Sequence, residues 1–265
     1  MLTGETFAAT GLDAVALKPT EHDLAAAPDL AADTVAVDYE GRDRLPDAET
    51  IAALAADATV YLTAPVRADG FDPLGDDGLF AEAFDLPATV GLTFVAGNKA
   101  YLDADERARA VAPRLRAALD RYPGDRPAPW VGTEGVERLA MAAGGVQYDL
   151  LGRSTGRELR ALRSVGFDRD VAVYAPTVLT DDEDAILEAL GEYVARRRAT
   201  RRALPEGAAT DARATGRARE VLLSAAEDFA LVGTASDVRE QVAALRAAGA
   251  TTVVGYPARG LDALR

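Results

Sequence analysis

The chain has 265 residues, enough for one large domain, and its 43 acidic and 29 basic side chains give a formal net charge of −14. Cysteine is absent, which excludes disulfides, thiolate zinc sites and cysteine nucleophiles. The negative charge makes nucleic acid and anionic membranes poor partners.

Neither a membrane span nor a secretion signal is predicted. No apolar run reaches the roughly 18 residues that a spanning helix needs, and the polar segment Met1–Thr10 lacks the basic and apolar regions of a signal peptide. We therefore expect a cytoplasmic protein. The acidic residues are dispersed, and only Lys18 and Lys99 are lysines, which is typical of proteins from salt-in halophiles. An acidic mesophilic protein is the alternative.

Eight strand-like runs alternate with Ala-rich helical segments along the whole chain. In chain order the runs are Asp13–Leu17, Thr34–Asp38, Thr59–Thr63, Thr89–Val95, Pro129–Gly132, Gln147–Leu151, Val171–Val178 and Thr251–Tyr256. This alternation predicts an α/β fold, a single (β/α)8 TIM barrel over residues 1–265. An open doubly wound sheet would give much of the same pattern.

The helical segments are marked by capping residues and apolar spacing. Glu21–Ala32 is weakened by Pro28, and Asp47–Thr50 opens the next helix. We then expect helices over Asp103–Tyr122 and Ser154–Val165, an antiparallel pair over Asp181–Arg198 and Asp211–Asp228, and a last helix from Thr234 to Gly249. The Gly-, Ala- and Pro-rich segment 204–216 is predicted to be a mobile insertion loop.

Cationic and polar residues follow several strands, at the end where barrels carry their chemistry. They are Lys18, Arg42, Arg67, Asn98, Lys99 and Arg153. Gathered at one rim, they would form a positive well that binds an anionic ligand. The alternative is that each cation pairs with an acid of a neighbouring loop, such as Asp38, Glu40, Asp69 or Asp72.

A glycine loop follows the fifth run. Gly132, Thr133, Glu134 and Gly135 lead from this strand into a helix, where backbone N–H groups and the helix dipole would favour a phosphate. A tight turn would explain the glycines equally.

Candidates for proton transfer are few. His22 is the only histidine, which excludes a His pair, and it would act as a single acid or base unless it is a solvent-facing residue at a helix start. No cluster of metal ligands is present. Arg196–Arg198, Arg201 and Arg202 are interpreted as cations at a helix C-terminus, with a binding patch as the alternative.

The C-terminal segment Asp228–Val242, containing Val232-Gly233-Thr234, resembles the end of the luciferase-like oxidoreductase superfamily. Pro129–Ala143 and Val171–Arg198 are similar to two further segments of that superfamily. The resemblance implies a (β/α)8 barrel that uses coenzyme F420 or FMN, with the cofactor phosphate at the Gly132–Gly135 loop. It also implies a possible homodimer through outer helices.

The leading hypothesis is an oxidoreductase in which Lys18, Arg42, Arg67 and Lys99 hold anionic groups of cofactor and substrate, and His22 or Tyr39 transfers a proton. One alternative is a noncatalytic ligand-binding barrel. Another is a cofactor-free, phosphate-binding isomerase or lyase, in which Glu40 is the catalytic carboxylate.

Overall fold

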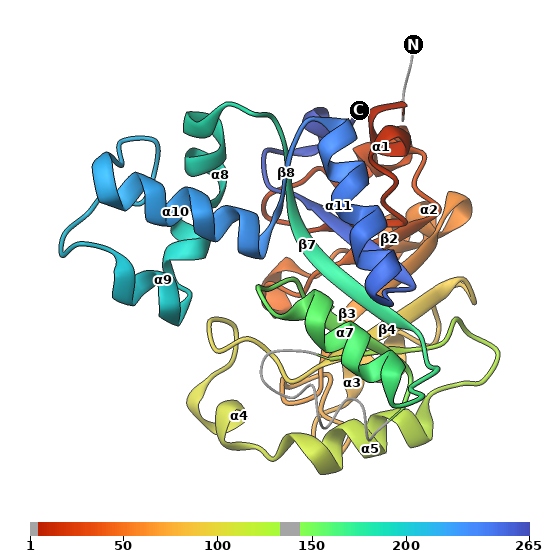
Figure 1. The fold of residues 1–265 in the computed structure, drawn as a ribbon. Coiled ribbons are helices and arrows are strands. Elements are labelled where there is room, and N and C mark those ends of the chain that lie inside the picture. The colour runs from red at the N-terminus through yellow and green to blue at the C-terminus, as the bar shows by residue number, and fades with distance from the viewer. Residues whose placement is uncertain (1–4, 133–143) are drawn as a thin grey trace.

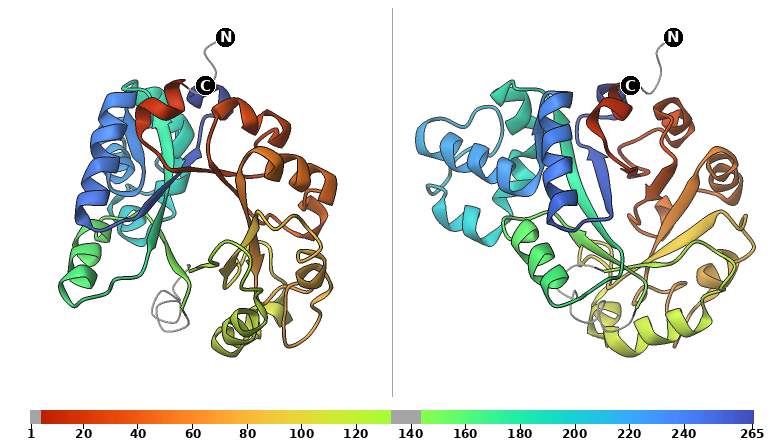
Figure 2. Two further views of the ribbon diagram at one scale, coloured as in Figure 1. Left: turned by 90° about the vertical axis from the view of Figure 1, so that its right-hand side faces the viewer. Right: turned by 45° about the vertical axis from the view of Figure 1, so that its right-hand side comes forward.

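The structure, a computed structural model, describes residues 5–132 and 144–265. The strands are β1 (Ala14–Leu17), β2 (Thr34–Val37), β3 (Thr59–Pro65), β4 (Val90–Val95), β5 (Trp130–Val131), β6 (Val146–Leu150), β7 (Val171–Leu179), β8 (Leu231–Gly233) and β9 (Thr252–Pro257). Eight of them form a closed parallel barrel. β1 to β7 pair in sequence, and β9 closes the ring between β7 and β1 (Figures 1 and 2).

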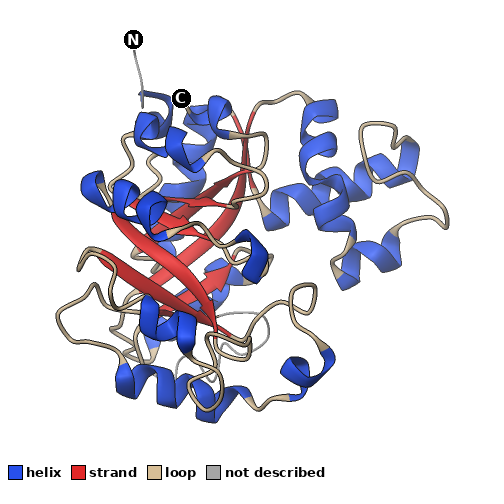
Figure 3. Ribbon diagram, turned by 180° about the vertical axis from the view of Figure 1, so that it is seen from behind, coloured by secondary structure: helices blue, strands red, loops and turns tan. Residues whose placement is uncertain are grey.

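Helices surround this barrel (Figure 3). They are α1 (Glu5–Thr10), α2 (Ala48–Asp57), α3 (Gly78–Glu82), α4 (Ala104–Ala108), α5 (Val111–Arg121), α7 (Thr155–Ser164), α8 (Glu183–Ala195), α9 (Arg198–Ala203), α10 (Gly216–Phe229) and α11 (Ala235–Ala248), with the 3-10 turns η1 (Leu24–Leu30), η2 (Arg42–Arg44) and η3 (Leu261–Leu264). None of the helices in the described ranges is long and apolar enough to cross a membrane.

The predicted barrel is confirmed, and each of the eight strand-like runs forms one of its strands. The short strand β8 was not predicted. It pairs with the carboxyl end of β7, where Leu231 lies opposite Thr177, and stays outside the closed ring.

The barrel interior combines small and large side chains. Alanines occupy β1 and β2, at Ala14, Ala16 and Ala36, while aromatic rings project from β3, β5, β6, β7 and β9. Tyr61 stacks on Trp130 with ring centroids 4.1 Å apart, and Trp130 stacks on Tyr148 at 5.1 Å. The alanines leave the volume that these rings fill inside the barrel.

One predicted helix is divided in two. Asp103–Tyr122 forms α4 and α5, with a break at Arg109 and Ala110. Pro113 explains the break, because in a continuous helix its ring would clash with the carbonyl of Arg109 and its missing N–H would leave that carbonyl unbonded. The capping residue Asp103 is as expected, and it forms a reciprocal capping box with Glu106.

The segment between β7 and β8 forms a helical insertion, α8 to α10, on the side where the barrel strands end (Figure 1). α8 and α10 pack against each other as predicted, although α10 begins at Gly216 and α8 ends at Ala195. The predicted loop 204–216 connects α9 to α10 and approaches α8 closely. A Cβ added to Gly191 would lie 2.1 Å from the Thr210 carbonyl oxygen, so only glycine permits this contact.

Candidate functional site

A pocket of about 450 Å³ opens at the carboxyl ends of the barrel strands. Its floor and walls include residues that end or follow β1, β2, β3, β4, β6, β7 and β9, and α8 covers one side. Six of the chain's eight tyrosines line it, namely Tyr39, Tyr101, Tyr148, Tyr174, Tyr193 and Tyr256. A pocket of this size, with aromatic walls and a few polar groups, is typical of a site for a small organic ligand.

Lys18, Glu21 and Tyr256 form a hydrogen-bonded cluster on this wall. Lys18 Nζ donates to Glu21 Oε1 at 2.8 Å and to the Tyr256 hydroxyl at 3.3 Å, and the Tyr256 hydroxyl donates to the other oxygen of Glu21. Burial alone would raise the pKa of Glu21, but the hydrogen bonds from Lys18 and Tyr256 outweigh it and lower that pKa. Burial and the bond to Glu21 raise the pKa of Tyr256, so its hydroxyl stays protonated.

A second carboxylate, Asp38, lies directly after β2 and faces the barrel tyrosines. Tyr174 Oη donates to Asp38 Oδ2 over 3.2 Å, which joins β7 to the end of β2. Burial, and secondarily the charge of Asp38, raises the pKa of both Tyr148 and Tyr174 well above the ordinary value. These tyrosines therefore present neutral hydroxyls and ring faces to a ligand.

Tyr39 and Glu40, both predicted as catalytic, also line the pocket. Tyr39 packs edge-on against Phe71 and Tyr101, and burial together with the Glu106 charge raises its pKa. Glu40 Oε2 accepts hydrogen bonds from the backbone and the hydroxyl of Thr20, at 2.8 and 2.7 Å. Both side chains are thus available at the pocket wall, but Glu40 is held by Thr20 and not by Lys18.

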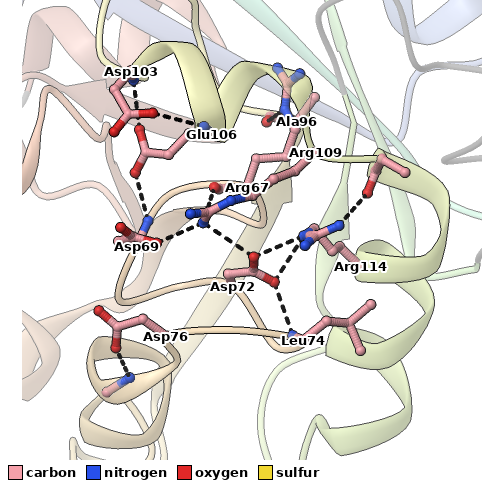
Figure 4. Close-up of polar contacts among 12 residues, drawn as sticks. Arg67, Asp69, Asp72, Leu74, Asp76, Ala96, Asp103, Glu106, Arg109 and Arg114 are labelled. Atoms are coloured by element: carbon pink, nitrogen blue, oxygen red, sulfur yellow. Dashed lines mark hydrogen bonds and ion pairs between the residues drawn. The ribbon is translucent and has the colours of Figure 1, made fainter.

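The predicted cations do not gather around the pocket. Of Lys18, Arg42, Arg67, Asn98, Lys99 and Arg153, only Lys18 and Asn98 line it. Arg42 pairs with Asp76 at 3.6 Å, and Arg153 pairs with Asp228 at 2.5 Å. Arg67 donates to the carbonyls of Ala96, Gly97 and Arg107, so its guanidinium is used to fix loops (Figure 4). Arg42 and Arg153 thus pair with acids and Arg67 with backbone carbonyls, and all of these partners are distant in the sequence.

The wall is instead rich in acids. The described charged residues on it are Glu21, Asp38, Glu40, Glu188 and Glu192, against Lys18 and Arg196. Since Lys18 is already paired with Glu21, the wall favours an uncharged or cationic group in the depth of the pocket. Within the described ranges, no group of three or more potential metal ligands occurs.

Comparison with protein families identifies a match over residues 7–264 to the family of unknown function DUF7388. The chain belongs to DUF7388. No curated protein matches the sequence. Among solved structures, this DUF7388 chain is similar to an F420-dependent secondary alcohol dehydrogenase in complex with an F420–acetone adduct, with 13% identity, a TM-score of 0.60 and 95% of each chain covered.

It is also similar to the coenzyme F420 dependent tetrahydromethanopterin reductase from Methanopyrus kandleri. There the identity is 14% and the TM-score 0.63, over 95% of this chain and 94% of the other. At these identities the likeness shows that the DUF7388 chain has the barrel fold of those enzymes.

His22, the third predicted catalytic residue, is buried and is not exposed at a helix start. Its Nδ1 accepts from the Lys18 backbone N–H at 3.0 Å, and its Nε2 lies 3.1 Å from the Pro257 carbonyl oxygen, which it can reach only as a donor. His22 is 7% exposed and does not line the pocket. Both ring nitrogens tie the end of β1 to the end of β9, which is a structural use of the side chain.

Gly132 is the only residue of the predicted phosphate loop that can be placed, since Thr133, Glu134 and Gly135 lie outside the described residues. A Cβ on Gly132 would lie 1.8 Å from the Tyr148 carbonyl oxygen. The close approach of β5 to β6 therefore accounts for this glycine.

Several pocket residues in this DUF7388 chain were not singled out from the sequence. They are Glu21, Asp38, Tyr101, Tyr148, Tyr174, Glu188, Glu192, Tyr193 and Tyr256. A usable signal existed for Tyr174, which stands between the apolar residues Val173 and Ala175 in its strand, so that its side chain points to the other face. The sequence alone does not show which face of each strand points into the barrel, so this alternation did not identify the pocket residues.

Proposed function

We propose that this protein is a luciferase-like oxidoreductase that binds F420, or alternatively FMN, with the cofactor ring in the tyrosine-lined pocket. The observation that carries the proposal is the concentration of six tyrosines at the carboxyl ends of the barrel strands. The fold shared with two enzymes described as F420-dependent supports the same assignment.

The chemistry of the wall suits the planar ring of such a cofactor. Tyr148, Tyr174 and Tyr256 offer aromatic faces and neutral hydroxyls, and Tyr39 and Tyr101 stand at the opposite wall. The acids on the wall do not suit a phosphate, so the ring and not the anionic part is proposed to enter the pocket. When bound, the cofactor would supply or accept a hydride.

The Lys18, Glu21 and Tyr256 cluster is the proposed proton-handling group. Tyr256 holds a proton on Oη, Glu21 keeps it there, and Lys18 lies 4.5 Å from the centroid of the Tyr256 ring. The single hydroxyl proton of Tyr256 is donated to Glu21, so a substrate oxygen would receive it by taking the place of Glu21 as the acceptor. Tyr39 stays a second proposed donor, while His22 is proposed to act only through the loops that it fixes.

Titration with F420 and with FMN in molar salt tests the proposal, with cofactor fluorescence or a difference spectrum as the readout. We expect saturable binding of at least one of them. Tyr101→Ala, at the exposed edge of the pocket, should weaken binding by about tenfold, as expected for loss of one aromatic stacking partner. Val165→Ala, an exposed residue of the α7 C-cap away from the pocket, is the matched control. Failure of both cofactors to bind would overturn the proposal.

A noncatalytic ligand-binding barrel is the second candidate. It is favoured by the fact that Glu21, Asp38 and Glu40 each already hold a protein hydrogen bond. Cofactor binding without turnover of alcohols, aldehydes or pterins would support it. The isomerase or lyase alternative requires Glu40 beside a lysine and is weakened by the bonds from Thr20 to Glu40.

A further inference from the structure

Four exposed arginines lie within seven residues on the helical insertion. Arg196 follows α8, and Arg198, Arg201 and Arg202 belong to α9; we call these four residues the α9 arginine cluster. In the described part of the chain, none of them forms an ion pair with an acidic side chain. Arg197 differs, because its guanidinium packs over the rings of Tyr193 and Phe229.

The positive charges of the α9 arginine cluster, taken alone, destabilise the folded chain. Like charges three and four residues apart on a helix repel one another, and the chain carries a net charge of −14 that could have supplied acidic partners. The neighbouring α10 shows the usual solution, since Arg219 pairs with Glu183 and Asp184 of α8. Among the residues that the structure describes, the α9 arginine cluster has no such partners, although it belongs to the same insertion.

The cluster adjoins the mouth of the pocket. Tyr193 and Arg196 line the pocket, and α9 begins two residues after Arg196. With a rise of about 1.5 Å per residue, the six residues of α9 extend only about 9 Å, little more than the reach of an extended arginine side chain. Figure 1 shows α9 on the side of the molecule toward which the barrel strands end.

The pocket and the cluster have opposite charge. Glu21, Asp38 and Glu40 make the depth of the pocket negative, so an anionic group of a bound ligand is repelled from it. The unpaired guanidiniums at the mouth attract such a group, and arginine is well suited to phosphate and carboxylate oxygens. A ligand with an uncharged ring and an anionic tail would satisfy both regions at once.

We propose that the α9 arginine cluster binds the phosphate or carboxylate groups of a ligand whose aromatic ring occupies the tyrosine-lined pocket. This inference rests on the proposed function and assigns the anionic end of the ligand to the insertion. The predicted anion-binding residues Arg42, Arg67 and Arg153 would then take no part, because they are engaged elsewhere.

The test compares F420 with its deazaflavin chromophore lacking the phosphate and glutamate tail. Affinities are measured by fluorescence at low and at molar salt for the native protein and for the variant Arg198→Ala/Arg201→Ala/Arg202→Ala. The control Arg157→Ala/Arg160→Ala/Arg239→Ala removes the same charge from exposed arginines of α7 and α11 that form no ion pair among the described residues.

We expect native protein to bind F420 more tightly than the tailless chromophore, with the difference decreasing as salt is raised. The α9 variant should lose roughly tenfold or more in F420 affinity, while its affinity for the tailless chromophore and the behaviour of the control stay unchanged. Equal F420 affinity in the α9 and control variants would overturn the inference while leaving the proposed function in place. Failure of F420, its tailless chromophore and FMN to bind the native protein would overturn the proposed function and this inference with it.

Discussion

Tyr174 and Asp38 face each other across the mouth of the barrel, with the tyrosine hydroxyl 3.2 Å from the carboxylate. The two residues come from β7 and from the end of β2, which are separated by more than half of the chain. Burial is the main cause of the raised pKa values of Tyr148, Tyr174 and Tyr256, and the Asp38 charge adds to all three, ranking after Glu21 at Tyr256.

Replacing Asp38 with Asn should therefore change the ionisation of the pocket. The variant keeps the shape of the side chain but removes its charge, so the pKa values of Tyr148 and Tyr174 should fall toward the ordinary value, while burial still holds them above it. Absorbance at about 295 nm, followed as the pH is raised, measures tyrosinate formation. Asp120→Asn, at an exposed position paired only with Arg116, serves as the control. A titration curve that matches that of the native protein would contradict the assigned role of Asp38.

Alkaline pH should destabilise the protein. All eight tyrosines have raised pKa values, chiefly through burial, so above the ordinary value of 10.0 the unfolded chain loses protons that the folded chain retains. The free energy of unfolding from this source is therefore present below pH 10 and decreases as the pH rises above it. Urea unfolding at pH 8, 10 and 11 measures the effect. A constant free energy of unfolding across that range would disagree with buried, neutral tyrosines.

Substituting His22 by Ala should reduce stability and leave the pocket chemistry intact. The change leaves the Lys18 N–H and the Pro257 carbonyl without their partner, at a cost of about 1–3 kcal/mol for each buried group that water cannot reach. Urea unfolding measures this loss, and cofactor titration below the unfolding range measures ligand binding. Undiminished stability combined with weakened cofactor binding would instead give His22 a direct role in the pocket.

Asp72 anchors the loop between β3 and α3 to the segment around α5. It is 1% exposed and accepts from Arg109 at 3.2 Å and Arg114 at 2.9 Å (Figure 4). Asp72→Asn should cost about 3–5 kcal/mol, because it breaks a buried charge pair and leaves the guanidinium of Arg114 without its carboxylate, while Arg109 keeps Asp69.

Asp69 provides the matched control, since it pairs with the same Arg109 at 2.7 Å but is 48% exposed. Asp69→Asn should cost only about 0–1 kcal/mol, because water screens an exposed pair. Chemical denaturation of both variants measures the contrast. A similar loss of unfolding free energy in the two variants would mean that burial does not determine how much Asp72 contributes to stability.

Gly132→Ala should destabilise the barrel whether or not the following loop binds a ligand. The new Cβ meets the Tyr148 carbonyl oxygen at 1.8 Å, so β5 and β6 must separate, at a cost of about 1–3 kcal/mol or more. Gly124→Ala, where nothing lies within 4 Å of the new Cβ, is the control and should be neutral. Thermal unfolding compares the two. Equal melting temperatures would show that the strands can adjust around the methyl group.

The order of elements could be predicted because it depends on local chemistry. Runs rich in Val, Leu and Tyr, capping residues such as Asp103 and Thr234, and the glycine at Gly249 each act within a few residues of the chain. The same local rules did not predict the break before α5. The cap at Asp103 indicates where the helix begins, but Pro113 interrupts it, because Pro113 has no N–H to bond with the Arg109 carbonyl.

The order and types of the residues were enough to predict the barrel, with an open sheet as the alternative, and they gave the net charge of −14 and the absence of cysteine chemistry. The composition of the pocket became known only from the folded chain, because a strand-end residue faces the pocket or the solvent according to how the barrel closes. Lys18 and Arg67 occupy similar positions after β1 and β3, yet Lys18 reaches the pocket while Arg67 binds the carbonyls of Ala96 and Gly97. The partners of a charged side chain are chosen by distance in space, and sequence spacing does not reveal them.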